Sequence, residues 1–80
     1  MRAAEHPGRI LRDQLRGRSV AELAFEIGIS PTVLAKILDE KAPITLEISK
    51  RLAETFGTTP EFWNRMQAQY DQWRENESGR

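Results

Sequence analysis

The feature that most constrains the fold of this chain is a pair of short helices predicted within residues 19–38 and joined by a tight turn. Ser19 and Glu22 have the spacing of a capping box, in which each side chain accepts from the other residue's backbone N–H at the start of a helix. Gly28 is suited to end this helix, because glycine adopts a positive φ at low steric cost. Two short helices and a glycine-centred turn within so few residues are typical of a helix-turn-helix motif.

The second helix of the motif begins at Ser30, a good N-cap, followed by Pro31, which fits the first helical position. In a helix-turn-helix protein this helix enters the DNA major groove and presents its N-terminal residues to the bases. We expect the exposed side to carry Ser30, Pro31, Thr32, Val33 and Lys36, and the buried side to carry Leu34, Ile37 and Leu38. An αα-hairpin of any small helical domain has the same caps and apolar spacing, so the motif alone leaves DNA binding and a purely structural role open.

Length and composition limit the class of protein. Eighty residues make one small domain. The chain has no cysteine and one histidine, which excludes a disulfide framework and a thiolate zinc site. It has no apolar run long enough to span a bilayer or to form the core of a signal peptide. We therefore expect a cytoplasmic protein without a metal, a cofactor or a membrane contact.

The net charge is zero, whereas nucleic-acid-binding domains are usually basic. The distribution is uneven, because residues 1–18 carry five arginines against one glutamate and one aspartate, an excess of three positive charges. Arg9, Arg12 and Arg16 lie on one side of the first predicted helix. Such a row is either an ordinary solvated face or a set of phosphate contacts.

Outside the motif, the pattern predicts three further helices, at roughly Pro7 to Gly17, Thr45 to Gly57 and Pro60 to Trp73. His6 is the expected N-cap of the first of these helices, a more ordinary role for a lone histidine than that of a catalytic base. The domain is therefore expected to span residues 6–73, with flexible ends at 1–5 and 74–80.

The last predicted helix carries an unusual stripe of large apolar side chains: Phe62, Trp63, Met66, Tyr70 and Trp73. A domain of four other short helices has limited room for them, so we expect only part of the stripe, Phe62 and Met66, to pack on it. Tyr70 and Trp73 would then expose an apolar patch, and aromatic residues are enriched in interface cores. We expect this helix, about 60–73, to form a dimer or to meet another protein. The alternative is a helix folded entirely onto its own domain.

Four segments of the chain resemble HigA-type antitoxins, a branch of the Xre-type helix-turn-helix proteins: HPGRILRDQL, SVAELAFEIGISPTVLAKIL, ITLEISKRLAETFGTTPEFW and QAQYDQW. The resemblance covers about residues 6–73. Its most specific parts are the His-Pro-Gly opening and the segment Gly57–Trp63, since the motif requires neither. The resemblance implies an all-α, five-helix lambda-repressor-like helix-turn-helix domain. It also implies a homodimer that neutralises a HigB-type ribonuclease toxin and represses their shared operon by sequence-specific binding to double-stranded operator DNA.

For a DNA-binding antitoxin, single residues have expected roles. Ser30, Thr32, Val33 and Lys36 would face bases, while Ser19, Lys41 and Thr45, with Arg9 or Arg12, would hold phosphates. The chain departs from the family at the start of the recognition helix, where arginine, glutamine or asparagine is common. Thr32 and Val33 suit thymine methyl groups, but no bidentate contact to guanine or adenine is available from this helix.

Two alternatives to the antitoxin remain. One is a stand-alone Xre-type transcriptional regulator, and the other is a helix-turn-helix interaction module that does not bind DNA. An enzyme is not expected, because the sequence contains neither a suitable base for a serine triad nor a glycine-rich phosphate loop.

Overall fold

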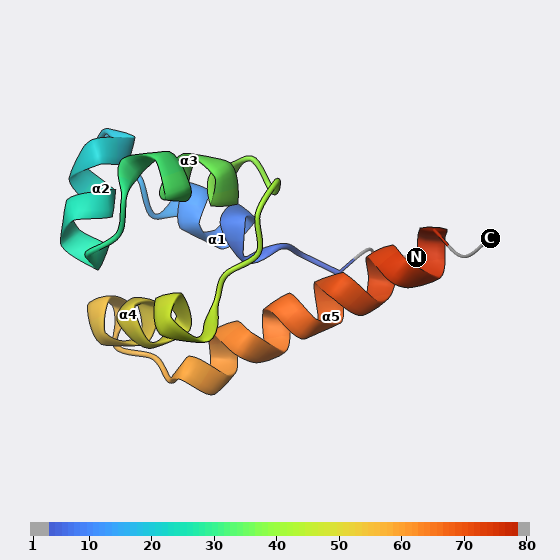
Figure 1. Ribbon diagram of the computed structural model, residues 1–80. Helices are drawn as coiled ribbons and strands as arrows, with labels where there is room; N and C mark the ends of the chain where they lie inside the picture. The colour runs from blue at the N-terminus through green and yellow to red at the C-terminus, as the bar shows by residue number, and fades with distance from the viewer. Residues whose placement is uncertain (1–3, 79–80) are drawn as a thin grey trace.

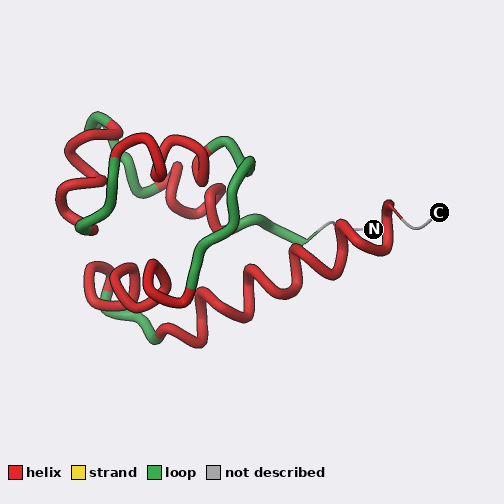
Figure 2. The backbone as a smooth tube through the Cα atoms, in the orientation of Figure 1, coloured by secondary structure: helices red, strands yellow, loops and turns green. Residues whose placement is uncertain are grey.

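The computed structural model describes residues 4–78, and within this range the only regular secondary structure is helical (Figure 1). The helices are α1 (Pro7–Asp13), α2 (Val20–Ile27), α3 (Pro31–Leu38), α4 (Leu46–Phe56) and α5 (Pro60–Ser78). The all-α, five-helix fold is therefore confirmed. Figure 2 shows that the loop after α3 crosses from the helix-turn-helix pair to α4, which lies beside the start of α5. Within the described range, none of the helices combines the length and the apolar character that crossing a bilayer requires.

The helix caps predicted from the sequence are present in the structure as side-chain to backbone hydrogen bonds. The N–H of Glu22 donates to Ser19 Oγ at 3.1 Å, and its carboxylate accepts from the N–H of Ser19 at 2.8 Å. Gly28 ends α2 in the left-handed region with φ 91°. The hydroxyl of Thr45 accepts from the N–H of Ile48 at 3.2 Å and starts α4. These local signals therefore fix where α2 and α4 begin and where α2 ends.

The core lies where all five helices converge. Its fully buried large side chains are Leu11, Leu23, Leu34, Ile37, Leu52 and Trp63. Burying a large apolar side chain stabilises a fold by about 1.5–3 kcal/mol. Helix α1 approaches the end of α3 so closely that a Cβ atom on Gly8 would lie 2.0 Å from the carbonyl oxygen of Ile37. The glycine of the His-Pro-Gly opening is therefore required by packing.

Helix α1 ends at Asp13, so the prediction that it continues to Gly17 is wrong. The next residues form a turn in which Arg16 and Gly17 have φ values of 49° and 84°. The Arg18 side chain donates to the carbonyl oxygens of Leu15 and Gln14, at 3.2 and 2.6 Å, and so satisfies acceptors that a longer helix would have used.

Helix α5 continues through Ser78, so the prediction of a flexible end is wrong for residues 74–78. This segment is rich in arginine, glutamate and glutamine, which have good helix propensity and prolong a helix that is already nucleated. Residues 1–3 and 79–80, also predicted to be flexible, lie outside the described residues.

The buried side of α5 differs from the predicted one. Phe62 was expected to pack on the domain, but it is 45% exposed, and Trp63 is the buried residue at 2% exposure. The indole N–H of Trp63 donates to Thr58 Oγ1 at 2.7 Å, and Gln67, one turn later, accepts from the N–H of Ile44 at 3.0 Å. These two bonds fix the rotation of α5, so the prediction that Trp63 belongs to a dimer interface is wrong, because its side chain is used in the core of its own chain.

Candidate nucleic-acid interface

Helix α3 exposes the side that the sequence assigns to DNA. Its buried side consists of Leu34 and Ile37 at 0% exposure and Leu38 at 4%, as predicted. Its exposed residues, counting the N-cap, are Ser30, Pro31, Thr32, Val33 and Lys36. The structure therefore brings these five candidates together on one face, and none of them is covered by the rest of the chain.

The first turn of α3 is fixed by its N-cap. Ser30 Oγ accepts from the backbone N–H groups of Thr32 and Val33, at 3.1 and 3.3 Å. Pro31 has no N–H to satisfy. The hydroxyl of Ser30 still has its own proton to donate, and the helix dipole makes this end of α3 electropositive. An anionic surface is therefore favoured next to the first turn.

The opposite end of α3 is held by Arg12. Its Nη2 donates to the carbonyl oxygen of Leu38 at 2.9 Å and lies 3.2 Å from Asp39 Oδ1. A cation is favourable at a helix C-terminus, so Arg12 stabilises the orientation of α3. Its predicted role as a phosphate contact stays a prediction, and the side chain is already engaged within the protein.

The remaining phosphate candidates lie on other elements than α3. Ser19 and Thr45 are exposed N-caps of α2 and α4, and each hydroxyl accepts from a backbone N–H of its own helix. Each keeps a proton that a phosphate oxygen could accept. Lys41 follows α3, where its backbone N–H donates to the carbonyl oxygen of Lys36 at 2.9 Å. Arg9 is exposed on α1. Their contact with phosphates stays a prediction.

The ion pairs of residues 4–78 leave Lys36 and Lys41 without acidic partners. Arg18 pairs with Glu26, and Arg51 Nε lies 3.2 Å from Glu47 Oε2. The third ion pair is that of Arg12. Both lysine side chains are exposed, one on α3 and one in the loop that follows it, so this part of the chain presents cations despite the zero net charge.

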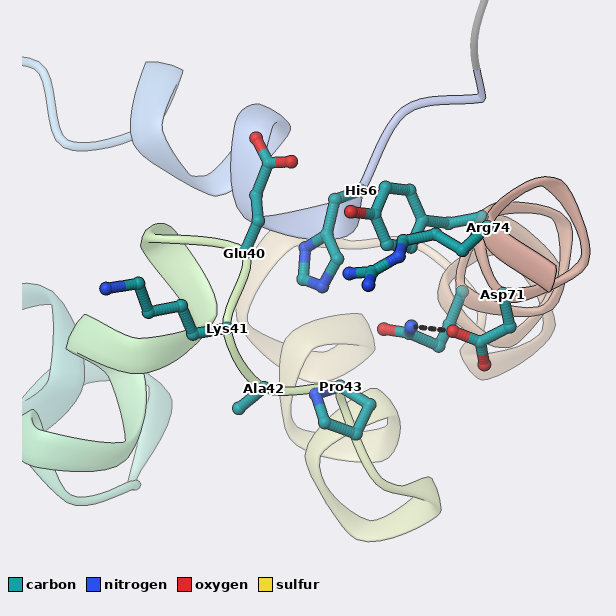
Figure 3. Close-up of a pocket in the computed structure, with 9 residues that line it drawn as sticks. His6, Glu40, Lys41, Ala42, Pro43, Asp71 and Arg74 are labelled. Atoms are coloured by element: carbon teal, nitrogen blue, oxygen red, sulfur yellow. Dashed lines mark hydrogen bonds between the residues drawn. The ribbon is translucent and has the colours of Figure 1, made fainter. Parts of the chain in front are cut away.

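A separate cavity of about 440 Å³ lies between the loop after α3 and helix α5 (Figure 3). His6 forms part of its wall and is 2% exposed. Its Nδ1 accepts from the N–H of Gly8 at 2.9 Å, which confirms the prediction that His6 caps α1. Burial lowers the pKa of His6, and the nearby Glu40 partly opposes this effect. The hydrogen bond from Gly8 and the lowered pKa both indicate that His6 is a structural acceptor, not a base available to a ligand.

Two exposed apolar residues were not singled out from the sequence. Phe25 on α2 is 89% exposed and Leu46 on α4 is 70% exposed. The signal was available for Phe25, because it lies on the opposite side of α2 from the buried Leu23 and Ile27. Leu46 directly follows the N-cap of α4 and precedes the buried residues of that helix, so helical spacing alone does not distinguish it from a core residue.

The model of the helix-turn-helix family matches residues 9–63 of this chain. This segment includes all of α2, α3 and α4. Among known proteins, virulence-associated protein I of Dichelobacter nodosus is 37% identical over 71 residues, which cover 85% of this chain and 66% of that protein. The chain spans 50%, 66% and 64% of the length of three of the curated relatives that it matches.

Solved structures extend the similarity beyond the motif. An addiction module antidote protein of the HigA family from Coxiella burnetii is 36% identical with a TM-score of 0.88, over 98% of this chain and 89% of that one. The antitoxin HigA of Pseudomonas aeruginosa, solved with the higBA promoter, is 31% identical with a TM-score of 0.86, over 94% of this chain and 85% of that one. The similarity therefore includes α5 as well as the helix-turn-helix motif.

Proposed function

Since this chain belongs to the helix-turn-helix family, and within it resembles HigA-type antitoxins, we propose that it is a regulator whose helix α3 recognises operator DNA in the major groove. The observation that carries the proposal is the division of α3 into two sides. Leu34 and Ile37 are completely buried, while Thr32, Val33 and Lys36 are exposed. A helix whose opposite side is packed in the core presents a rigid surface, and the major groove is wide enough to admit an α-helix.

We further propose that the protein is the antitoxin of a type II pair, neutralises a HigB-type ribonuclease and represses its own operon. Support comes from the two HigA-type proteins to which it is similar, one of them solved with the higBA promoter. The His-Pro-Gly opening supports the same assignment, since it is among the most specific parts of the resemblance to HigA-type antitoxins. A stand-alone regulator is the alternative, and a toxin-sized reading frame beside the gene distinguishes the two.

A homodimer is part of the proposal. The C-terminal half of α5 extends beyond the other helices (Figure 1), and Tyr70 and Trp73 on it are only half-buried, as is Met66 one turn before Tyr70. Phe62 is 45% exposed at the other end of the helix. These four residues are the proposed contacts between two copies. A symmetric dimer places two copies of α3 about one DNA turn apart, which suits a palindromic operator.

The experiment that tests DNA binding is a gel shift on the promoter of the protein's own operon at several salt concentrations. Replacing Lys36 with alanine should weaken binding and flatten the log–log salt slope by about one unit if Lys36 contacts a phosphate. Lys50→Ala, at an exposed position of α4, is the matched control and should leave the slope unchanged. A protein that binds this promoter no more tightly than unrelated duplex DNA contradicts the proposal and favours an interaction module.

A further inference from the structure

The exposed face of α3 is poor in groups that read bases through paired hydrogen bonds. It presents the ring of Pro31, the side chains of Thr32 and Val33 and the ammonium of Lys36. Val33 is 39% exposed although it is apolar. Guanine and adenine are best distinguished by the forked side chains of arginine, asparagine and glutamine. None of these residue types occurs in α3 or at its N-cap.

The serine at the N-cap adds little to base recognition. Ser30 Oγ already accepts two backbone N–H groups, from Thr32 and Val33. It has one proton to donate, which fits any of several acceptors in the major groove and so does not by itself distinguish one base pair from another.

Three arginines on neighbouring elements, Arg12, Arg18 and Arg51, do not replace the missing forked side chains, because each is engaged in contacts within the protein. Arg12 bonds to Leu38 and Asp39 at the far end of α3. Arg18 pairs with Glu26 and also donates to two backbone carbonyl groups. Arg51 pairs with Glu47, and its Nη1 would lie only 2.8 Å from a Cβ atom on Gly28, so it packs on the turn of the motif. Each guanidinium group would have to give up a structural contact to reach a base.

One feature of the major groove remains for such a surface to recognise. The C5-methyl group of thymine is the apolar group among the base edges there, and threonine methyl and other apolar side chains pack against it. On the basis of the proposed DNA binding, we propose that Thr32 and Val33 determine specificity by contacting thymine methyl groups. Lys36 adds a point charge to this contact. The preferred operator half-site then contains thymine at the positions that face the first turn of α3.

The experiment uses two DNA duplexes. One is the promoter, and the other is the sequence that the protein selects from a random pool. Thymines are replaced one at a time by deoxyuridine, which removes only the methyl group. Affinity should fall by about fourfold at one or two positions in each half-site, the loss expected for a buried group of this size. Thymines outside the half-sites are the control and should show no change.

A double-mutant cycle assigns the methyl contact to its residue. In Val33→Ala, an exposed substitution that leaves the core intact, deoxyuridine at the sensitive position should have almost no further effect. Thr32→Ser, which removes a methyl group and keeps the hydroxyl, should do the same at its own position. Tight binding that is insensitive to every deoxyuridine substitution, or selection of half-sites without thymine, overturns this inference. Failure to bind any duplex instead overturns the proposed function.

Discussion

The imidazole ring of His6 lies edge-on against the ring of Tyr70, with centroids 4.7 Å apart and an interplanar angle of 87°. The Nδ1 atom of the same imidazole accepts from the N–H of Gly8. One buried side chain therefore both starts α1 and contacts the C-terminal half of α5. The direction in which the proposed dimer helix leaves the domain consequently depends on His6.

Acidification should destabilise the fold through His6. Burial lowers the pKa of His6 below the ordinary value of 6.5, so the unfolded chain binds this proton more tightly than the folded chain does. A protonated Nδ1 also cannot accept from Gly8. The free energy of unfolding should therefore decrease as the pH falls below about 6.5, and this contribution should level off below the folded-state pKa.

Thermal unfolding across this pH range measures the effect of His6. His6→Asn is the informative variant, because an asparagine oxygen also caps a helix but does not titrate. Its stability should change less between about pH 7.5 and pH 5.5 than that of the unmodified protein, a range set by the ordinary histidine pKa. Identical pH dependence in the two proteins would show that His6 does not titrate with folding.

Gly8→Ala should be strongly destabilising. The added Cβ atom would meet the carbonyl oxygen of Ile37 at 2.0 Å, so α1 would have to move away from α3. We expect a loss of about 1–3 kcal/mol in a denaturant titration, as for overpacked cores. Gly17→Asn is the control, because a Cβ there meets nothing within 4 Å and asparagine tolerates positive φ. Equal losses in the two variants would contradict the close packing of α1 on α3.

Two neighbouring aromatic residues of α5 should behave differently when replaced. Trp63→Ala removes a side chain that is 2% exposed, with its hydrogen bond to Thr58, and should cost about 3–5 kcal/mol of unfolding free energy. Phe62→Ala removes a side chain that is 45% exposed and should cost much less in the stability of the single domain. The reverse order in chemical denaturation would mean that α5 is rotated relative to the structure.

Sedimentation should show a dimer that depends on the projecting half of α5. Trp73 lies 5.7 Å from Tyr70 between ring centroids, and both are half-buried. A charge at Trp73 would be desolvated in a dimer, so Trp73→Glu should give a monomer with unchanged helix content. Gln72→Glu, an exposed neighbour on the same helix, should remain dimeric. A monomeric unmodified protein would contradict the proposed assembly.

Local chemistry explains which parts of the fold the sequence predicts. The starts of α2, α3 and α4 follow from residues within one turn of each other, as in the bond from Glu22 to Ser19. The two sides of α3 likewise follow from helical spacing, so its exposed residues were identified correctly.

The rotation of α5 is not predictable in this way, because partners outside the helix determine it. Gln67 bonds to the backbone of Ile44, and Trp63 bonds to Thr58 before the helix begins. Spacing places Phe62 and Trp63 on adjacent positions and does not say which of them enters the core. The extension of α5 through Ser78 was missed because its polar composition indicates both disorder and an exposed helix.

The most direct test of the central claim is a titration of the isotopically labelled protein with its promoter duplex, followed through backbone amide resonances. The amides of Thr32, Val33 and Lys36 should shift or broaden most, and the effect should saturate. The amides of Glu54 and Glu61, exposed on α4 and α5, should change least. Saturable changes confined to α5, with those of α3 unaffected, would contradict recognition of DNA by this helix.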